Sequence, residues 1–86
     1  KRVAYVDDKP VELTYKEYEL LKYLALNRGI VLTRDNIMDR IWSTDYEGES
    51  RTLDVHIKTL RHKLGTAGNY IKTVRNVGYF MDDEAK

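Results

Sequence analysis

The sequence predicts a small α+β domain in which three helices are flanked by antiparallel strands. Apolar residues recur at helical spacing in three separate segments, and short runs rich in β-branched and aromatic residues flank turn residues near both ends of the chain. The chain has 86 residues, 42% of them hydrophobic and 34% charged, which suits one folded domain over residues 1–86. It has no cysteine, so neither a disulfide framework nor a zinc–thiolate site can form.

Two features concern the setting of this domain. No apolar run approaches the roughly 18 residues of a membrane span, and no charged-then-apolar signal segment opens the chain. A cytoplasmic protein without membrane contact is the simplest interpretation. The chain begins at Lys1 and not at methionine, which suggests a fragment of a longer protein.

The N-terminal segment predicts a β-hairpin. Residues 2–6 and 11–13 are rich in β-branched and aromatic side chains, and the segment Asp7-Asp8-Lys9-Pro10 between them contains residues that turns prefer. The turn is therefore expected over residues 7–10. Two strands alone are marginally stable, so a helix or a third strand must cover one face, and part of the sheet can lie upstream of Lys1.

The first helix is predicted to begin after Thr14. The hydroxyl of Thr14 can accept from the amide of Glu17, and Glu17 can reach back to the amide of Thr14, which is the pattern of a capping box. Leu13 and Tyr18 stand where a hydrophobic staple closes the same end. The helix should end at an Asn-Arg-Gly segment, where Gly29 can supply a left-handed turn. Its inward side chains should be Leu21, Leu24 and Ala25.

The second helix follows a short apolar connector, residues 30–32, which we expect to be buried as a link or a strand. Thr33 can cap this helix, and Asp35 in its first turn suits the positive end of the helix dipole. Spacing indicates an apolar side made of Ile37, Met38 and Ile41, and Trp42 ends the helix.

The third helix is predicted over residues 50–64. At about 100° per residue, four apolar residues form one narrow stripe for the core: Leu53, Ile57, Leu60 and Leu64. The opposite side mixes cations, hydroxyls and one apolar group: Arg51, Thr52, Val55, Lys58, Thr59 and His62. In a DNA major groove, cations meet phosphates and guanines, hydroxyls meet base edges, and small apolar groups meet thymine methyls. We therefore interpret the segment as a recognition helix; the alternative is an ordinary surface helix with one exposed valine.

The second and third helices, with the polar segment 43–49 between them, form a helix-turn-helix with a lengthened turn. The connector is acidic and carries one aromatic side chain. This composition indicates either a contact surface for another protein or a solvated loop.

A second hairpin is predicted behind the third helix. After a glycine-rich break, residues 70–74 and 79–81 are strand-like. Asn76 and Gly78 tolerate positive φ, so they specify the turn between these strands. Arg75 lies just before the tip. A hairpin in this place, with a cation at its end, is a wing that can reach a neighbouring minor groove. The acidic C-terminal end is expected to fray.

Positive charge is concentrated in one part of the chain. Residues 50–81 contain six Lys or Arg and a single Asp, whereas the rest is net acidic. Such a basic segment is typical of a surface that binds a polyanion. No constellation for catalysis is present, because the chain has no glycine-rich phosphate loop and no G-x-S-x-G turn. His56 and His62 lie roughly 240° apart on a helix and cannot share a metal ion. We expect no enzyme activity, no cofactor and no metal.

Several segments together resemble a known family. The C-terminal DNA-binding domain of OmpR/PhoB-type response regulators closely resembles R-T-L-D-V-H-I-K-T-L-R-H-K-L, followed by I-K-T-V-R-N-V-G-Y. The segments that precede these in the family are similar to L-T-Y-K-E-Y-E-L-L and V-L-T-R-D-N-I-M-D-R-I-W. The resemblance covers residues 2–81. It implies a winged helix-turn-helix with three helices, a flanking antiparallel sheet and a C-terminal β-hairpin wing, which binds double-stranded DNA as the output domain of a two-component transcriptional regulator.

The resemblance also implies roles for individual residues. Positions that meet bases and nearby phosphates correspond to Arg51, Thr52, Val55, Lys58 and Thr59. Positions that mostly hold the DNA backbone correspond to Trp42, His56, Arg61, Thr73 and Tyr79. Arg75 corresponds to the wing arginine that enters the minor groove. The connector corresponds to a loop that touches RNA polymerase in some members, and here it contains Thr44, Asp45, Tyr46, Glu47 and Glu49.

Such domains usually bind direct-repeat half-sites as head-to-tail dimers, and phosphorylation of a receiver domain promotes the pairing. No phosphorylation site is therefore expected in this chain. Lys58 and Thr59 stand where the family often has arginine; lysine cannot make the bidentate fork and threonine has no charge, so we expect a different base preference and weaker binding. Asn76 replaces a common glycine of the wing turn. The alternative function is a winged-helix module that binds protein and does not read DNA.

Overall fold

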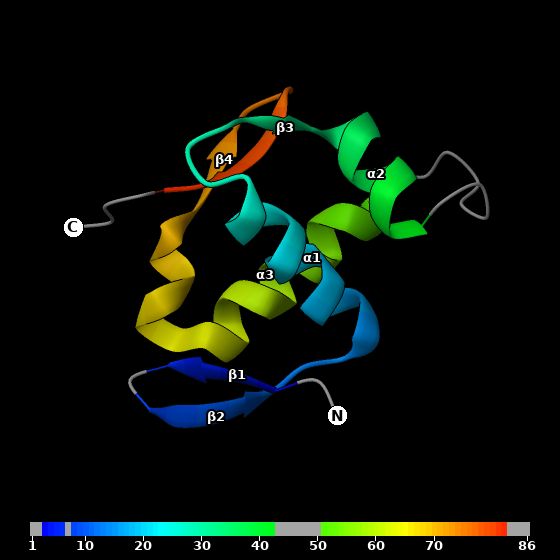
Figure 1. The fold of residues 1–86 in the computed structure, drawn as a ribbon. Coiled ribbons are helices and arrows are strands. Elements are labelled where there is room, and N and C mark those ends of the chain that lie inside the picture. The colour runs from blue at the N-terminus through cyan, green and yellow to red at the C-terminus, as the bar shows by residue number, and fades with distance from the viewer. Residues whose placement is uncertain (1–2, 7, 43–50, 83–86) are drawn as a thin grey trace.

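The computed structural model describes residues 3–6, 8–42 and 51–82, the first two residues of the last range by their backbone only. Three helices pack between two small antiparallel sheets, and the fold predicted from the sequence is confirmed (Figure 1). The helices are α1 (Tyr15–Leu26), α2 (Arg34–Trp42) and α3 (Arg51–Leu64). One sheet pairs β1 (Val3–Val6) with β2 (Lys9–Glu12), and the other has the order β3-β5-β4, with β3 at Leu32–Thr33, β4 at Ile71–Val74 and β5 at Gly78–Met81.

The core lies where the three helices meet the inner face of the β3-β5-β4 sheet. The predicted apolar stripes of α2 and α3 are both buried, and β5 adds Tyr79 and Met81. In Figure 1 the β1-β2 hairpin lies at one end of the molecule and the tip of the β4-β5 hairpin at the other, with the helices between them. The core therefore fixes α3 and the C-terminal hairpin to one another.

Helix α1 begins as predicted but buries a different set of side chains. The capping box is present: Thr14 Oγ1 accepts from the Glu17 amide at 3.2 Å, and Glu17 Oε1 accepts from the Thr14 amide at 3.0 Å. Gly29 takes the predicted left-handed conformation, with φ of 81°. The prediction that Ala25 faces inward is wrong, because the helix turns Leu20 and Leu24, which are four residues apart, to the core. Ala25 is exposed.

The connector before α2 is less buried than predicted. Leu32 is buried and pairs with Tyr79 of β5, but Ile30 is 57% exposed and Val31 is 42% exposed. Successive side chains of an extended segment point to opposite sides, so Val31 must face solvent when Leu32 faces the core. The Ile30 amide donates to the Asn27 carbonyl at 3.0 Å, which places Ile30 in the turn that follows α1.

The turn of the N-terminal hairpin is shorter than predicted. Val6 pairs with Lys9 and Tyr5 with Pro10, so Lys9 and Pro10 belong to strand β2 and not to the turn. Asp8 has φ of 68°, a left-handed conformation that lets the chain reverse within two residues. A strand of a two-stranded sheet has one open edge, where the missing amide hydrogen of a proline is tolerated.

The C-terminal hairpin differs from the prediction in its boundaries and in the role of one glycine. Residues 65–70 form a 3-10 helix, β4 begins at Ile71, and β5 begins at Gly78. Asn76 has the predicted positive φ, 65°. Gly78 does not have a positive φ. Glycine is required at this position because a Cβ would lie 1.9 Å from the carbonyl oxygen of Leu32. Strand β3 approaches β5 so closely that no side chain fits between them.

Candidate nucleic-acid interface

The outward face of α3 is not covered by the described parts of the chain. Val55 is 58% exposed, and Lys58 and His62 beside it are exposed as well. With Thr59 and Arg61, these residues line a shallow hollow along the helix. Thr59 Oγ1 donates to the Val55 carbonyl at 3.0 Å, so its hydroxyl is turned back along its own helix. The part of the predicted mixed face that the structure describes, from Val55 to His62, is therefore open on the surface, as a recognition helix requires.

The β4-β5 hairpin carries Arg75, Asn76 and Val77 at its exposed tip. The tip is anchored, because the Arg34 amide at the start of α2 donates to the Val77 carbonyl at 3.1 Å. Figure 1 shows this tip beside strand β3, which leads into α2. Arg75, the predicted minor-groove cation, thus lies at the end of a fixed hairpin.

Asp54 in the first turn of α3 joins three elements. Both of its carboxylate oxygens accept from the Arg34 guanidinium of α2, at 2.8 and 2.9 Å, and the Tyr79 hydroxyl of β5 also donates to it. The Arg34 hydrogen bonds hold the pKa of Asp54 below its ordinary value. Partial burial raises this pKa, but the Tyr79 hydrogen bond lowers it further. Burial and the bond to Asp54 raise the pKa of Tyr79. Sequence reasoning missed this cluster, although a lone acid in a basic segment was a signal for it.

Arg61 ties the same helix to strand β4. Its Nε and Nη2 donate to the Ile71 carbonyl at 3.0 and 2.8 Å, and Nη2 also donates to Thr73 Oγ1 at 2.7 Å. The guanidinium lies 5.7 Å from the centre of the Tyr79 ring, which is almost fully buried. The structure thus brings together three residues that were predicted to contact the DNA backbone, Arg61, Thr73 and Tyr79. Their polar groups, however, bond to the protein itself. They fix the wing against α3, and direct contact with DNA stays a prediction for them.

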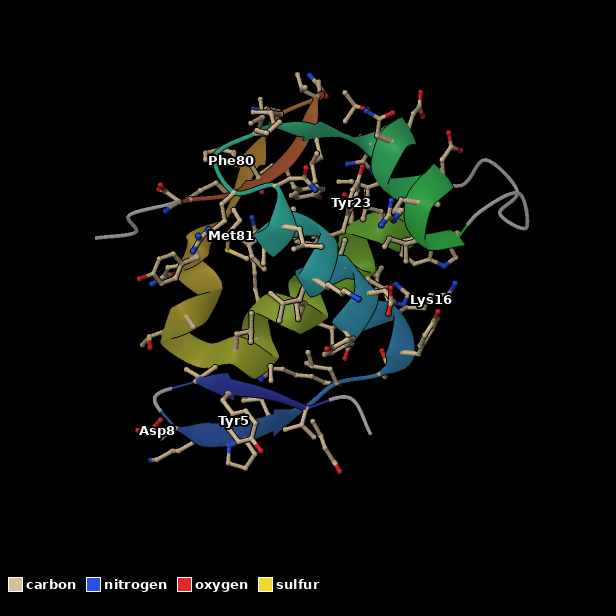
Figure 2. All side chains as sticks on the ribbon, in the orientation of Figure 1. Tyr5, Asp8, Lys16, Tyr23, Phe80 and Met81 are labelled. Carbon is tan, nitrogen blue, oxygen red and sulfur yellow. The ribbon has the colours of Figure 1, made fainter. Side chains whose placement is uncertain are left out.

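Trp42 and His56 meet at the end of α2. Their rings make an edge-to-face contact with centres 5.0 Å apart. Lys16 of α1 donates from Nζ to the Ile41 carbonyl at 2.8 Å and lies 5.4 Å from the Trp42 ring (Figure 2). Sequence reasoning missed Lys16, although a cation in the first turn of a helix is unfavourably placed unless it has a partner elsewhere. Lys16 caps the last turn of α2 and helps to position Trp42.

A second carboxylate stabilises the other side of α3. Glu17 is 3% exposed and accepts from Lys63 Nζ at 2.7 Å, in addition to its bond within the capping box. Burial raises the pKa of Glu17, but the hydrogen bonds from Lys63 and from the Thr14 amide outweigh burial, and the pKa falls below its ordinary value. This pair joins α1 to α3 away from the outward face.

Some predicted residues cannot be placed. The connector with its possible polymerase contacts, Thr44, Asp45, Tyr46, Glu47 and Glu49, lies outside the described residues, as do the side chains of Arg51 and Thr52. Among the helices of the described ranges, none is long and apolar enough to cross a membrane.

Comparisons with known proteins agree with this geometry. The family described as "Transcriptional regulatory protein, C terminal" matches residues 8–81. Sensory transduction protein RegX3 of Mycolicibacterium smegmatis is 44% identical over 85 residues, which cover 95% of this chain and 37% of RegX3. The chain therefore spans little more than a third of that relative.

Solved structures with the same fold include two DNA-binding domains. That of Bacillus subtilis CssR superposes with a TM-score of 0.83 and 30% identity, covering 93% of this chain and 90% of that domain. That of Klebsiella pneumoniae RstA, in complex with the RstA box, has a TM-score of 0.81 and 33% identity, covering 94% and 83%. This chain belongs to the family of C-terminal domains of transcriptional regulatory proteins, in the OmpR/PhoB-type response regulators.

Proposed function

We propose that this chain binds double-stranded DNA sequence-specifically, as the output domain of a two-component transcriptional regulator. Helix α3 lies in the major groove and the β4-β5 wing reaches the adjacent minor groove. The observation that carries this proposal is the outward face of α3, where exposed Val55 lies among cations and no described segment covers it. DNA-binding domains such as that of RstA share the fold and give further support.

The dimensions and chemistry of the two surfaces fit a duplex. A single helix fits the major groove of B-DNA, where each base pair presents its own set of donors, acceptors and methyl groups. Lys58 and His62 supply donors on α3, and Arg75 supplies a cation at the wing tip. The Asp54 and Arg61 hydrogen bonds hold these surfaces in one arrangement, so that both can engage neighbouring grooves without reorganisation.

The chain spans 37% of RegX3, and we propose that the regulator likewise includes more than this domain. We infer a receiver domain in the remaining length that relatives such as RegX3 have, and head-to-tail dimers of this domain on direct-repeat half-sites. The acidic connector, residues 43–49, is proposed to contact RNA polymerase. Such a regulator acts in the cytoplasm, where its DNA lies.

A selection from a random duplex pool tests DNA binding directly. We expect the chain to enrich one short motif, and its affinity for the enriched duplex to fall steeply between about 50 and 200 mM salt, because each neutralised phosphate releases counterions. If no motif is enriched and binding shows no salt dependence, the proposal is wrong. The alternative, a module that binds protein through apolar surface, predicts that result.

A charge placed on the outward face of α3 locates the interface. Val55→Glu should abolish specific binding, because a carboxylate would face phosphates and would be desolvated against base edges. Tyr5→Glu is the matched control, since Tyr5 is also an exposed apolar residue but lies on the β1-β2 hairpin, at the far end from the wing (Figures 1 and 2). Equal affinities of the two variants in a gel-shift titration would show that the interface is elsewhere.

A further inference from the structure

We propose that α3 reads thymine through an apolar contact made jointly by Val55 and the methyl group of Thr59. The inference rests on the proposed function and deepens it, because it assigns a base preference to the middle of the helix. It begins from one hydrogen bond, that of Thr59 Oγ1 to the Val55 carbonyl at 3.0 Å.

This bond decides which part of Thr59 can meet a base. A threonine hydroxyl has one proton, and Thr59 donates it to the carbonyl four residues earlier. The hydroxyl therefore cannot also donate to a base edge. The side chain still lines the hollow on the outward face of α3, and its methyl group is the terminus that does not bond to the backbone. Thr59 therefore offers no donor to a base, and its methyl group is the part that can make an apolar contact.

Val55 and Thr59 form one apolar strip. They are four residues apart on α3, a spacing that brings side chains side by side, with Cβ atoms about 5–6 Å apart. Val55 is the more exposed of the two. Lys58 and His62 lie along the same face, so the strip has a cation and an imidazole beside it. A strip of this kind excludes water from one position of the groove while its neighbours bind anionic or acceptor groups.

Thymine is the base that complements such a strip. Its C5 methyl group is the apolar feature of the major-groove edge, and no other base carries one. An adenine or cytosine amino group set against the Val55 side chain and the Thr59 methyl group would lose its water without gaining a hydrogen-bond partner from either, which carries a free-energy cost. Attraction to the methyl group and this desolvation penalty both favour thymine. We therefore expect thymines at the positions that face the middle of α3.

Replacing thymine by deoxyuridine tests the DNA side of the contact. The probe is the duplex that this chain enriches from a random pool, synthesised with deoxyuridine at one thymine position at a time, which removes a methyl group and leaves base pairing intact. Affinity should fall about three- to fivefold for each contacted methyl group, as expected for one buried carbon. Deoxyuridine at a thymine outside the enriched motif is the control and should have no effect.

Two nearly isosteric variants test the protein side. Thr59→Val keeps a methyl group and removes the hydroxyl, and should bind the enriched duplex within about twofold of wild type. Thr59→Ser keeps the hydroxyl and removes the methyl, and should lose as much affinity as the deoxyuridine probe does. Because both changes remove the same contact, their effects should not add when Thr59→Ser is measured on that probe. Thermal unfolding of both variants separates loss of contact from loss of fold.

Three results would overturn the inference. Equal binding of every deoxyuridine probe would show that no methyl group is read. Weak binding by Thr59→Val together with wild-type binding by Thr59→Ser would show that the hydroxyl reads the base. Additive losses would show that Thr59 and thymine do not meet. The proposed function fails separately, if the wild-type chain enriches no duplex at all, and the inference fails with it.

Discussion

The two hairpins of this domain have the same size but are joined to the core in different ways. Each pairs two four-residue strands, and each turn has a non-glycine residue with positive φ, Asp8 in one and Asn76 in the other. No residue of β1 or β2 is fully buried, although some pack against the core from outside. By contrast, β4 and β5 bury Ile71, Tyr79 and Met81, the last of which is labelled in Figure 2.

Polar bonds enlarge this difference. Described side chains of α3 bond to the C-terminal hairpin through Asp54 and Arg61, and the Arg34 amide bonds to its tip. The hairpin that is proposed to bind DNA is thus held by hydrogen bonds to the helix that is proposed to read it. Changes in β4-β5 should therefore affect both stability and DNA binding, whereas equivalent changes in β1-β2 should affect stability alone or neither.

The largest effect is expected from Gly78→Ala. Its Cβ would collide with the Leu32 carbonyl, so β3 and β5 must separate, and the free energy of unfolding should fall by about 3 kcal/mol or more. Gly65→Ala is the matched control: it has open space around it and φ of 63°, so it should cost about 1–2 kcal/mol of backbone strain. Urea unfolding measures both. Equal losses would show that β3 does not confine Gly78.

Loss of one buried hydroxyl should have the next largest effect. Tyr79→Phe removes the donor to the Asp54 carboxylate and should lower the free energy of unfolding by about 1–3 kcal/mol, as for other hydrogen bonds to charged groups. The affinity for DNA should fall as well, because α3 and the wing lose a connection. Tyr5→Phe in β1 removes an exposed hydroxyl and should change stability by less than about 0.5 kcal/mol. If Tyr79→Phe leaves the free energy of unfolding unchanged, the hydrogen bond to Asp54 contributes nothing to stability.

The two turn residues give the most direct contrast. Asp8 and Asn76 both adopt the left-handed conformation. Alanine lacks the short polar side chain whose local hydrogen bonds help Asn and Asp to adopt it, so Asn76→Ala and Asp8→Ala should each be strained. Each should cost about 1 kcal/mol of stability. Only Asn76→Ala should also weaken DNA binding, since it disturbs the tip that carries Arg75. Weaker binding by both variants to the same degree would remove the distinction between the hairpins.

The smallest effect is a dependence of stability on pH. The pKa of Asp54 is lowered in the folded protein, so its contribution is complete above the ordinary value of 3.8 and is lost as the pH falls below that value. Because the Asp54 side chain is 48% exposed, water screens the pair and the contribution is small. The stability difference between wild type and Asp54→Asn should therefore shrink from pH 7 to pH 3, and the pH dependence due to Glu17 cancels in this comparison. A difference that is constant with pH would contradict the pairing.

Sequence reasoning succeeded where the deciding contacts are local. The capping box of α1 joins Thr14 and Glu17, three residues apart, and the buried stripe of α3 follows from helical periodicity alone. Positive φ at Asn76 follows from the type of residue at a turn.

It failed where the deciding contacts join distant segments. The exposure of Val31 depends on which residues of the connector pair with β5, and the need for Gly78 depends on the approach of β3. The Asp54 cluster joins residues from α2, α3 and β5, so no spacing within one element reveals it. For the same reason, Arg61, Thr73 and Tyr79 could not be recognised from sequence as partners of one another.

Methylation interference on the enriched duplex tests most directly whether α3 and the wing engage one duplex together. Dimethyl sulfate modifies guanine N7 in the major groove and adenine N3 in the minor groove, so one experiment reports both grooves. We expect interference at guanines that face α3 and at adenines in the minor groove beside them, and we expect Arg75→Ala to lose the adenine signals alone. Interference confined to one groove, or an Arg75→Ala pattern identical to that of wild type, would contradict the account.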